Sequence, residues 1–392
     1  MYRTQIFLLA LCYLSLVVAA PTQPKKRSFK VHRIRVPNYV PNGLTALRRA
    51  YEKFNIPNSP FIQGLNNTDI ELTVPGLAAS DSDNPGSTEQ GQVNASPAKG
   101  DREFVSPVTI GGQTVVMDFD TGSSDMWVFS TTLDSASQAG HTIYDPTKSS
   151  TFKPMDGATF NVSYGDGSFA LGGVGTDTVD IGGASVENQA IGLPTQVDAS
   201  FVQDQASNGL VGLAFSQLNT IKPQKQKTFF DNIIGDLEEP VFTASLKQGA
   251  VGSYEFGNID QSGFQGQLTD VPVLSNSGFW MFNSQQIAVG NGQPMSVSDS
   301  GLAIADTGTS LLIVDLPVVE AYWGPIPGVM NTQNGVVFPC DTALPDLSLA
   351  VGDNYMATIS GDLMNFAPVG ADATGQQCTF LVFGFPLFRL PP

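Results

Sequence analysis

The chain has 392 residues, of which 14% are charged and 41% hydrophobic, and it contains 40 glycines and 26 prolines. This balance favours an all-β globular protein with many turns and excludes a coiled coil or a disordered chain. The formal net charge of −17 argues against a nucleic-acid partner, because phosphates require Lys and Arg.

The N-terminal residues have the pattern of a secretory signal peptide. Arg3 precedes an apolar run over residues 6–18, which ends at small alanines. The run is too short for a stable membrane span. The proline at position 21 disfavours cleavage directly before it, so we expect residues 1–19 to be removed after Ala19. We therefore expect a secreted, extracellular protein without a membrane anchor.

Residues 20–100 are expected to form a basic pro-segment and a linker. The first 100 residues carry a net charge of +5, whereas residues 101–392 carry −22. This asymmetry predicts an electrostatic attraction between the two parts, with chance composition as the alternative. Helical spacing of apolar residues predicts a helix over 43–54, and the low apolar content of 79–100 predicts a linker.

The body of the chain begins near Phe104 and consists of short apolar runs separated by glycine turns. We expect strands over residues 105–110, 113–120, 159–164, 172–181 and 186–193. Short alternating strands with frequent turns are typical of a sandwich or barrel. We divide the body into an N-terminal lobe, 101–275, and a C-terminal lobe, 276–392.

Cysteine usage predicts one disulfide bond. Cys12 leaves with the signal peptide, so Cys340 and Cys378 form an even pair in a chain bound for an oxidising compartment. No Cys/His cluster with metal-ligand spacing exists, and no glycine-rich loop carries a phosphate-binding lysine. We therefore expect neither a metal nor a cofactor.

The tripeptide Asp-Thr-Gly occurs twice, each time after an apolar run and before a hydroxyl residue. The copies and their following residues are Asp120-Thr121-Gly122-Ser123 and Asp306-Thr307-Gly308-Thr309. One copy is weak support for a site, because Asp and Gly are ordinary turn residues. Two copies with matching flanks predict a duplicated half-site that brings two carboxyl groups face to face.

Two carboxyl groups that share one proton can hydrolyse a peptide bond. One removes a proton from water, while the other protonates the carbonyl oxygen and then the leaving nitrogen. Each motif can support its carboxyl group, because the glycine N–H can donate to it and the following hydroxyl, of Ser123 or Thr309, can donate to its outer oxygen.

These twin motifs resemble those of the pepsin-like aspartic proteases, and the chain is most similar to the fungal penicillopepsin and aspergillopepsin type. The resemblance covers residues 25–384. It implies an all-β, bilobal fold of two related β-barrel lobes with a catalytic cleft between them. It implies Asp120 and Asp306 as the catalytic pair, and a hydrophobic-hydrophobic-Gly segment beside each loop, at 209–212 and 381–384.

The same resemblance implies the substrate-binding residues. Gly-Asp-Gly between extended runs predicts a hairpin, and in the family this hairpin is a flap, here with Tyr164, Gly165 and Asp166. Trp127 matches the tryptophan that supports the flap tyrosine, and Phe201 and Leu210 match pocket-lining positions. Core packing is the alternative for these apolar residues. The resemblance implies a preference for large hydrophobic side chains at the cleavage site.

The expected partners are protein and peptide substrates and the chain's own pro-segment, and we expect a monomer. Lys53 resembles the zymogen lysine that pairs with the catalytic carboxyl groups, although a solvated helix lysine is the alternative. Glycosylation sequons begin at Asn66, Asn94 and Asn161.

Other catalytic classes have little support in the sequence. A Ser/His/Asp triad would depend on His141, because the other histidine, His32, lies in the expected pro-segment, and no Gly-x-Ser-x-Gly elbow precedes a helix pattern. A retaining glycosidase could use two carboxyl groups about 5 Å apart, but it gives no reason for twin Asp-Thr-Gly motifs.

The C-terminus departs from the family pattern. Gly384 is followed by a proline-rich stretch over 385–392, which cannot replace a paired central strand. We therefore expect an incomplete C-terminal lobe with apolar surface exposed beneath Asp306. A non-catalytic or misfolded protease-like protein is the alternative to an active secreted endopeptidase.

Overall fold

The computed structural model describes residues 29–33, 92–98, 103–164, 167–247, 250–296, 301–309, 311–332, 335–368, 377–380 and 382–385. The expected signal peptide, the helix over 43–54, Lys53, and the flap residues Gly165 and Asp166 lie outside these ranges. Within them, no helix is long and apolar enough to cross a bilayer.

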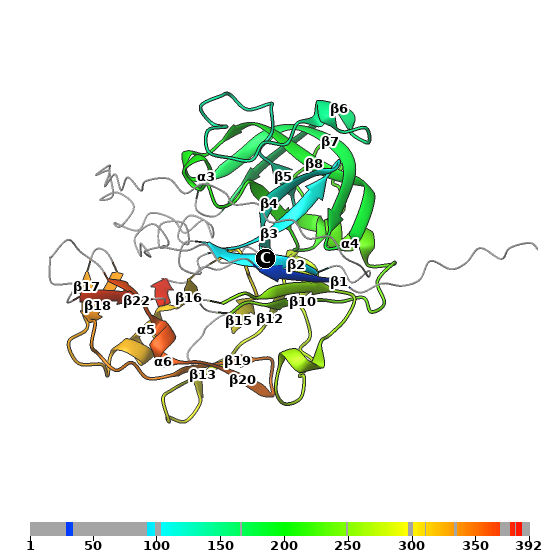
Figure 1. Ribbon diagram of the computed structural model, residues 1–392. Coiled ribbons are helices and arrows are strands. Elements are labelled where there is room, and N and C mark those ends of the chain that lie inside the picture. Colours follow the sequence, from blue (N-terminus) through cyan, green and yellow to red (C-terminus); the bar gives the residue numbers. More distant parts are fainter. Residues whose placement is uncertain are drawn as a thin grey trace, which may run out of the picture.

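Six strands of the N-terminal half close into a barrel (Figure 1). The strands, in their order around the barrel, are β3 (Glu103–Ile110), β4 (Gln113–Asp120), β9 (Gly209–Gly212), β5 (Met126–Val128), β8 (Ala184–Val197) and β7 (Phe169–Ile181). Pairing of Thr109 and Ile110 in β3 with β7 closes the ring. Strand β4 runs parallel to β9, while β5 runs antiparallel to it, so β9 lies between them.

Alternation of apolar residues explains why these strands form a barrel wall. In β4, Val115, Met117 and Phe119 are buried at 1% exposure or less. In the hairpin strand β6 (Lys153–Ser163), Ala158, Phe160 and Val162 are buried between exposed neighbours. A period of two places alternate side chains on one face, which then packs into a core.

The sheet continues beyond both sides of the barrel. Strand β6 pairs with β7 on one side. On the other side, further strands follow β3 in the order β2 (Gln92–Ala98), β1 (Phe29–Arg33), β11 (Ser253–Phe256) and β10 (Phe242–Ser245). In Figure 1 these strands cross the middle of the molecule below the barrel.

The C-terminal half contains four smaller sheets among its described strands. Their strands, in order within each sheet, are β12 (Met281–Asn283) and β15 (Leu302–Ile304); β14 (Met295–Ser296), β13 (Gln286–Val289), β19 (Leu347–Val351) and β20 (Tyr355–Ile359); β16 (Leu312–Asp315) and β23 (Val382–Phe385); and β17 (Met330–Thr332), β18 (Gly335–Pro339), β22 (Gln377–Phe380) and β21 (Asn365–Pro368). The described α-helices are α3 (Ala199–Gln203), α4 (Phe229–Ile233), α5 (Leu316–Trp323) and α6 (Gly361–Met364).

The hydrophobic cores follow the two halves of the chain. Two clusters fill the N-terminal half, one around Phe119 and Phe256 and one around Trp127 and Phe160. A third packs Tyr322 and other side chains of α5 against the strands of the C-terminal half. The all-β prediction is confirmed, and the five expected strands correspond to β3, β4, β6, β7 and β8. The boundary at 275/276 remains a prediction.

Candidate active site

The first Asp-Thr-Gly motif lies where β4 leaves the barrel. Asp120 is the last residue of β4, stands opposite Gly212 of β9, and is only 1% exposed. The N–H of Leu213 donates to the Asp120 carbonyl at 2.8 Å, and the N–H of Ala214 donates to the Ser123 carbonyl at 2.8 Å. A Cβ on Gly212 would lie 2.6 Å from the backbone of Ser124. Glycine at 212 therefore allows β9 to approach this loop closely.

The second motif follows the short strand β15. Met281 of β12 pairs with Ile304 of β15, and the N–H of Ala305 donates to the Trp280 carbonyl at 3.0 Å. Asp306, the next residue, is partly exposed. Its carboxyl group accepts hydrogen bonds from the Gly308 N–H at 2.9 Å and from Thr309 Oγ1 at 2.7 Å.

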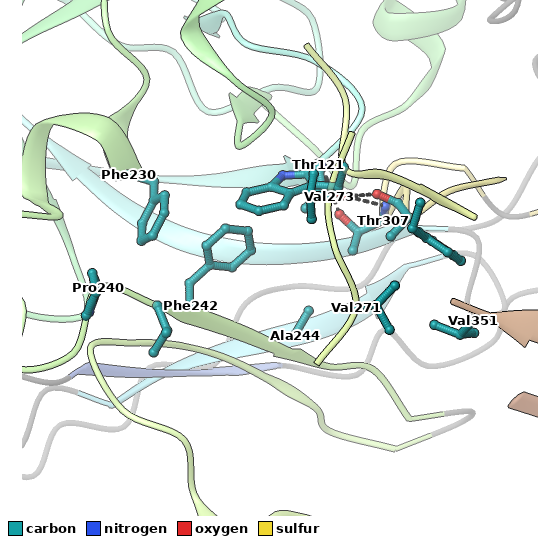
Figure 2. Close-up of a pocket in the computed structure, with 13 residues that line it drawn as sticks. Thr121, Phe230, Pro240, Phe242, Ala244, Val271, Val273, Thr307 and Val351 are labelled. Atoms are coloured by element: carbon teal, nitrogen blue, oxygen red, sulfur yellow. Dashed lines mark hydrogen bonds between the residues drawn. The ribbon is translucent and has the colours of Figure 1, made fainter. Parts of the chain in front are cut away.

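The two threonines join the loops reciprocally. The N–H of Thr121 donates to Thr307 Oγ1 at 3.1 Å, and the N–H of Thr307 donates to Thr121 Oγ1 at 2.9 Å. Each hydroxyl in turn donates across the interface, Thr121 to the Ala305 carbonyl at 2.9 Å and Thr307 to the Phe119 carbonyl at 2.7 Å. Figure 2 shows the threonines meeting in this way. The loops are thus held in a nearly symmetric pair.

The two glycines bring the carboxyl groups together. A Cβ on Gly122 would lie 2.7 Å from the carboxyl group of Asp306, and one on Gly308 would lie 2.3 Å from Oδ1 of Asp120. Each carboxyl group therefore packs against the bare backbone of the opposite loop. Gly122 also donates its N–H to Asp120 Oδ1 at 2.8 Å, as predicted.

The prediction that Ser123 donates to Asp120 is wrong in this structure. Its Oγ is buried and has no hydrogen-bond partner among the described residues. Thr309, at the corresponding position of the second loop, does make the expected bond. The physical reason is that packing around each side chain selects among staggered χ1 wells of similar energy, and at Ser123 it does not select the donating one.

The predicted flap is the hairpin between β6 and β7. The N–H of Tyr164 donates to the Ser168 carbonyl at 2.8 Å, and Gly167, at φ +74°, donates to the Tyr164 carbonyl at 2.9 Å. Nε1 of the fully buried Trp127 donates to the Tyr164 hydroxyl at 2.7 Å. The structure thus brings together the tryptophan and tyrosine that the resemblance paired.

The other two predicted pocket residues join the same cluster. Phe201, on α3, packs edge-on against Trp127 and Tyr164, with ring centroids 5.1 Å and 5.5 Å away. Leu210 of β9 stands opposite Trp127 and is 7% exposed. The four side chains therefore form one largely buried apolar cluster that includes the flap tyrosine.

Sequence reasoning missed a buried carboxyl group five residues after Asp120. Asp125 is 1% exposed and accepts hydrogen bonds from the Thr220 N–H and hydroxyl, both at 3.1 Å, and from Asn219 Nδ2 at 3.2 Å. Burial raises the pKa of Asp125 to about 6, although the bonds from Thr220 and the charge of Lys225 act in the opposite direction. The one available signal was a charged residue directly before the apolar run that contains Trp127.

An apolar cavity of about 390 Å³ borders the two threonines (Figure 2). Besides Thr121, Ala305 and Thr307, its wall includes the aromatic residues Phe230, Phe242, Trp280 and Phe282 and the valines Val241, Val271, Val273 and Val351. Its polar side-chain groups are already bonded, since Trp280 Nε1 donates to the Leu213 carbonyl at 2.9 Å. The apolar surface exposed beneath Asp306 and the incomplete C-terminal lobe both remain predictions.

Cys340 is disulfide-bonded. The residue follows β18, and Cys378 lies on β22, which pairs with β18 through Phe338 opposite Cys378. The Cys378 side chain lies outside the described part, so the Cys340–Cys378 pairing remains a prediction. Among the described residues, no group of three His, Cys, Asp or Glu side chains is placed to hold a metal ion.

Comparison with known proteins agrees with this geometry. Residues 103–387 match the eukaryotic aspartyl protease family. A protein of Aspergillus fumigatus named as an aspergillopepsin A-like aspartic endopeptidase is 51% identical, with 97% of this chain and 91% of the relative covered. Aspergillopepsin-1 of Aspergillus oryzae is 40% identical, covering 95% and 90%, and endothiapepsin of Cryphonectria parasitica is 41% identical, covering 91% and 82%. The chain therefore belongs to the eukaryotic aspartyl protease family and is an aspartic endopeptidase of the aspergillopepsin type.

Proposed function

We propose that Asp120 and Asp306 are the catalytic pair of this endopeptidase and that it works in acid. The observation that carries this proposal is the contact of each carboxyl group with the backbone glycine of the opposite loop. Two carboxyl groups held in this way retain one proton between them over an acidic pH range. The pair then contains a base and an acid at the same time.

The reaction uses both members. The ionised carboxylate takes a proton from a water molecule, whose oxygen attacks the peptide carbonyl carbon, and the protonated carboxyl group gives its proton to the carbonyl oxygen. The resulting tetrahedral intermediate collapses when a proton reaches the nitrogen and the C–N bond breaks. Thr121 and Thr307 keep the two loops, and hence the two carboxyl groups, in register.

The proposed substrates are proteins with large hydrophobic side chains at the cleavage site. The cluster of Trp127, Tyr164, Phe201 and Leu210 supports this preference, because its surface is apolar and lies beside the flap hairpin. A closing flap excludes water and positions the scissile bond.

We also propose that the protein is secreted as a zymogen whose pro-segment, with Lys53 as a candidate ion-pair partner, inhibits it at neutral pH. The charge asymmetry of the sequence supports this. Strand β1, from the basic segment, pairs with β11 of the body, which is further support. Acid weakens the attraction by protonating carboxylates.

The test is to compare Asp120→Asn and Asp306→Asn with Asp156→Asn, which changes an exposed aspartate of β6. Each change at the proposed pair should reduce acid proteolysis at least about 1000-fold, and the control should not. A statine inhibitor, which places a hydroxyl between the two carboxyl groups, should block the parent protein. Cleavage at pH 8 that resists this inhibitor would overturn the proposal.

A further inference from the structure

His141 lies in the loop between β5 and β6 and contacts the end of α3 (Figure 1 places α3 at the edge of the barrel). Its Nε2 lies 3.1 Å from the carbonyl oxygen of Val202. Its ring stacks on Phe129, with centroids 3.8 Å apart and planes within 12°. Phe129 is a 1% exposed residue directly after β5, so the imidazole is held by the rigid barrel on one face.

The Val202 carbonyl is a group that needs such a donor. Helix α3 has only five residues, and the last carbonyls of a helix have no partner within it. Basic side chains near a helix C-terminus can satisfy these carbonyls. Because a carbonyl only accepts, the proton must reside on Nε2.

Helix α3 carries Phe201, the residue before Val202. Phe201 contacts both Trp127 and Tyr164, and so forms part of the proposed substrate pocket. At its other end, α3 is held by the N–H of Asp198, which donates to the Phe169 carbonyl at 2.8 Å. His141 thus fixes the end of the helix that follows Phe201.

We propose that His141 is a positioning residue that sets the place of Phe201 and thereby the enzyme's selectivity for large hydrophobic side chains. This inference rests on the proposed function. His141 does not touch the paired carboxyl loops in any contact described for it, so its effect should appear in substrate selection and not in the chemical step.

The test uses the full chain after incubation in acid and two peptides that differ only in Phe or Ala before the scissile bond. His141→Phe keeps a flat ring over Phe129 but removes the donor, and His141→Gln keeps a donor. With His141→Phe, KM for the Phe peptide should rise about tenfold, with kcat and the Ala peptide little changed. His141→Gln should recover part of this selectivity.

Gln138→Leu is the matched control, because Gln138 Nε2 donates to the Leu133 carbonyl at 2.6 Å within the same loop. It should leave the KM ratio of the two peptides unchanged. Equal losses for both peptides, or the same loss with Gln138→Leu, would show a merely structural role and overturn the inference. If His141→Phe does not fold, His141→Gln carries the test in two backgrounds. It should lower the selectivity of the parent protein and have no further effect on selectivity in Phe201→Ala, because His141 acts through Phe201. An equal effect in both backgrounds overturns the inference. Titration of active sites with a statine inhibitor separates these outcomes from failure of the proposed catalytic pair.

Discussion

Asp120 and Asp306 follow strands in very different surroundings. Asp120 is the last residue of β4, a barrel strand paired with β3 and β9, and it is 1% exposed. Asp306 follows β15, which pairs with β12 in a two-stranded sheet, and is partly exposed. Yet the glycine and threonine contacts of the two loops are nearly the same. The repeated motif therefore determines the chemistry of each loop, while strands distant in sequence determine its burial.

The hydrophobic-hydrophobic-Gly segments differ in the same way. In β9, Gly212 stands opposite Asp120 itself. In β23, Gly384 stands opposite Val314 of β16, which lies beyond the second loop. Two similar short segments thus pair with different parts of their half-sites. We expect the first loop to be more rigid than the second, and the following changes test that comparison.

Replacing the loop glycines should have the largest effect. A Cβ at 308 would meet Asp120 Oδ1 at 2.3 Å, and one at 122 would meet the Asp306 carboxyl group at 2.7 Å. Gly308→Ala and Gly122→Ala should each reduce kcat/KM by at least about 100-fold, because displacement of about 1 Å in a catalytic group has this effect. Gly308→Ala should be the more harmful, since its clash presses on the more buried carboxyl group.

Gly173→Ala is a suitable control, because Gly173 lies in a strand and an added Cβ there would meet no atom within 4 Å. Steady-state kinetics in acid measure all three variants. Near-normal activity of Gly308→Ala would contradict the close approach of the loops.

Replacing the loop threonines by the isosteric valine should destabilise the fold. Thr121→Val removes the acceptor of the Thr307 N–H and the donor to the Ala305 carbonyl, and the loss should be about 2–4 kcal/mol in the free energy of unfolding. Thr307→Val removes the acceptor of the Thr121 N–H and the donor to the Phe119 carbonyl, but it should lower the free energy of unfolding by less. Thr121 is 5% exposed, whereas Thr307 is partly exposed, so water can replace some of its bonds.

Urea unfolding of both variants measures this difference, with Thr131→Val, at an exposed threonine, as the control. Equal losses would show that the two loops do not differ in rigidity.

Asp125→Asn should change the pH dependence of stability. The pKa of Asp125 is about 6 in the folded state against 3.8 for the ordinary group. The folded state therefore binds this proton more tightly. The bound proton therefore adds roughly 3 kcal/mol to the free energy of unfolding. This contribution is fully present below about pH 4 and declines as the pH rises to about 6. Asn does not titrate, so the variant should lack this decline.

The measurement is urea unfolding from pH 4 to pH 7, with Asp156→Asn as the control. The slope between pH 4 and pH 6 is the quantity to compare, because the amide also alters the bonds to Thr220. A slope unchanged in Asp125→Asn would show that another group causes the decline.

The sequence predicted what depends on local pattern. Alternation of apolar residues predicts β4 at its observed bounds, and the family resemblance predicts the contact of Trp127 with Tyr164, which are joined by a hydrogen bond. The sequence did not predict the hydrogen bonds of Asp125 with Thr220 or of His141 with Val202, because these bonds join residues far apart in the chain. The rotamer of Ser123 was also beyond sequence reasoning, because packing selects among staggered wells of similar energy.

The smallest effect is expected where the two motifs differ in sequence. In Thr309→Ser the hydroxyl can still reach Asp306 Oδ2, but the side chain loses the restriction that β-branching places on χ1. The loss of transition-state stabilisation should be under about 1 kcal/mol, which corresponds to a fall of less than about fivefold in kcat/KM. A tenfold loss of kcat/KM in Thr309→Ser would contradict this expectation. It would show that the χ1 rotamer of Thr309 is as important for the more exposed second loop as the pairing of β4 with β9 is for the buried first loop.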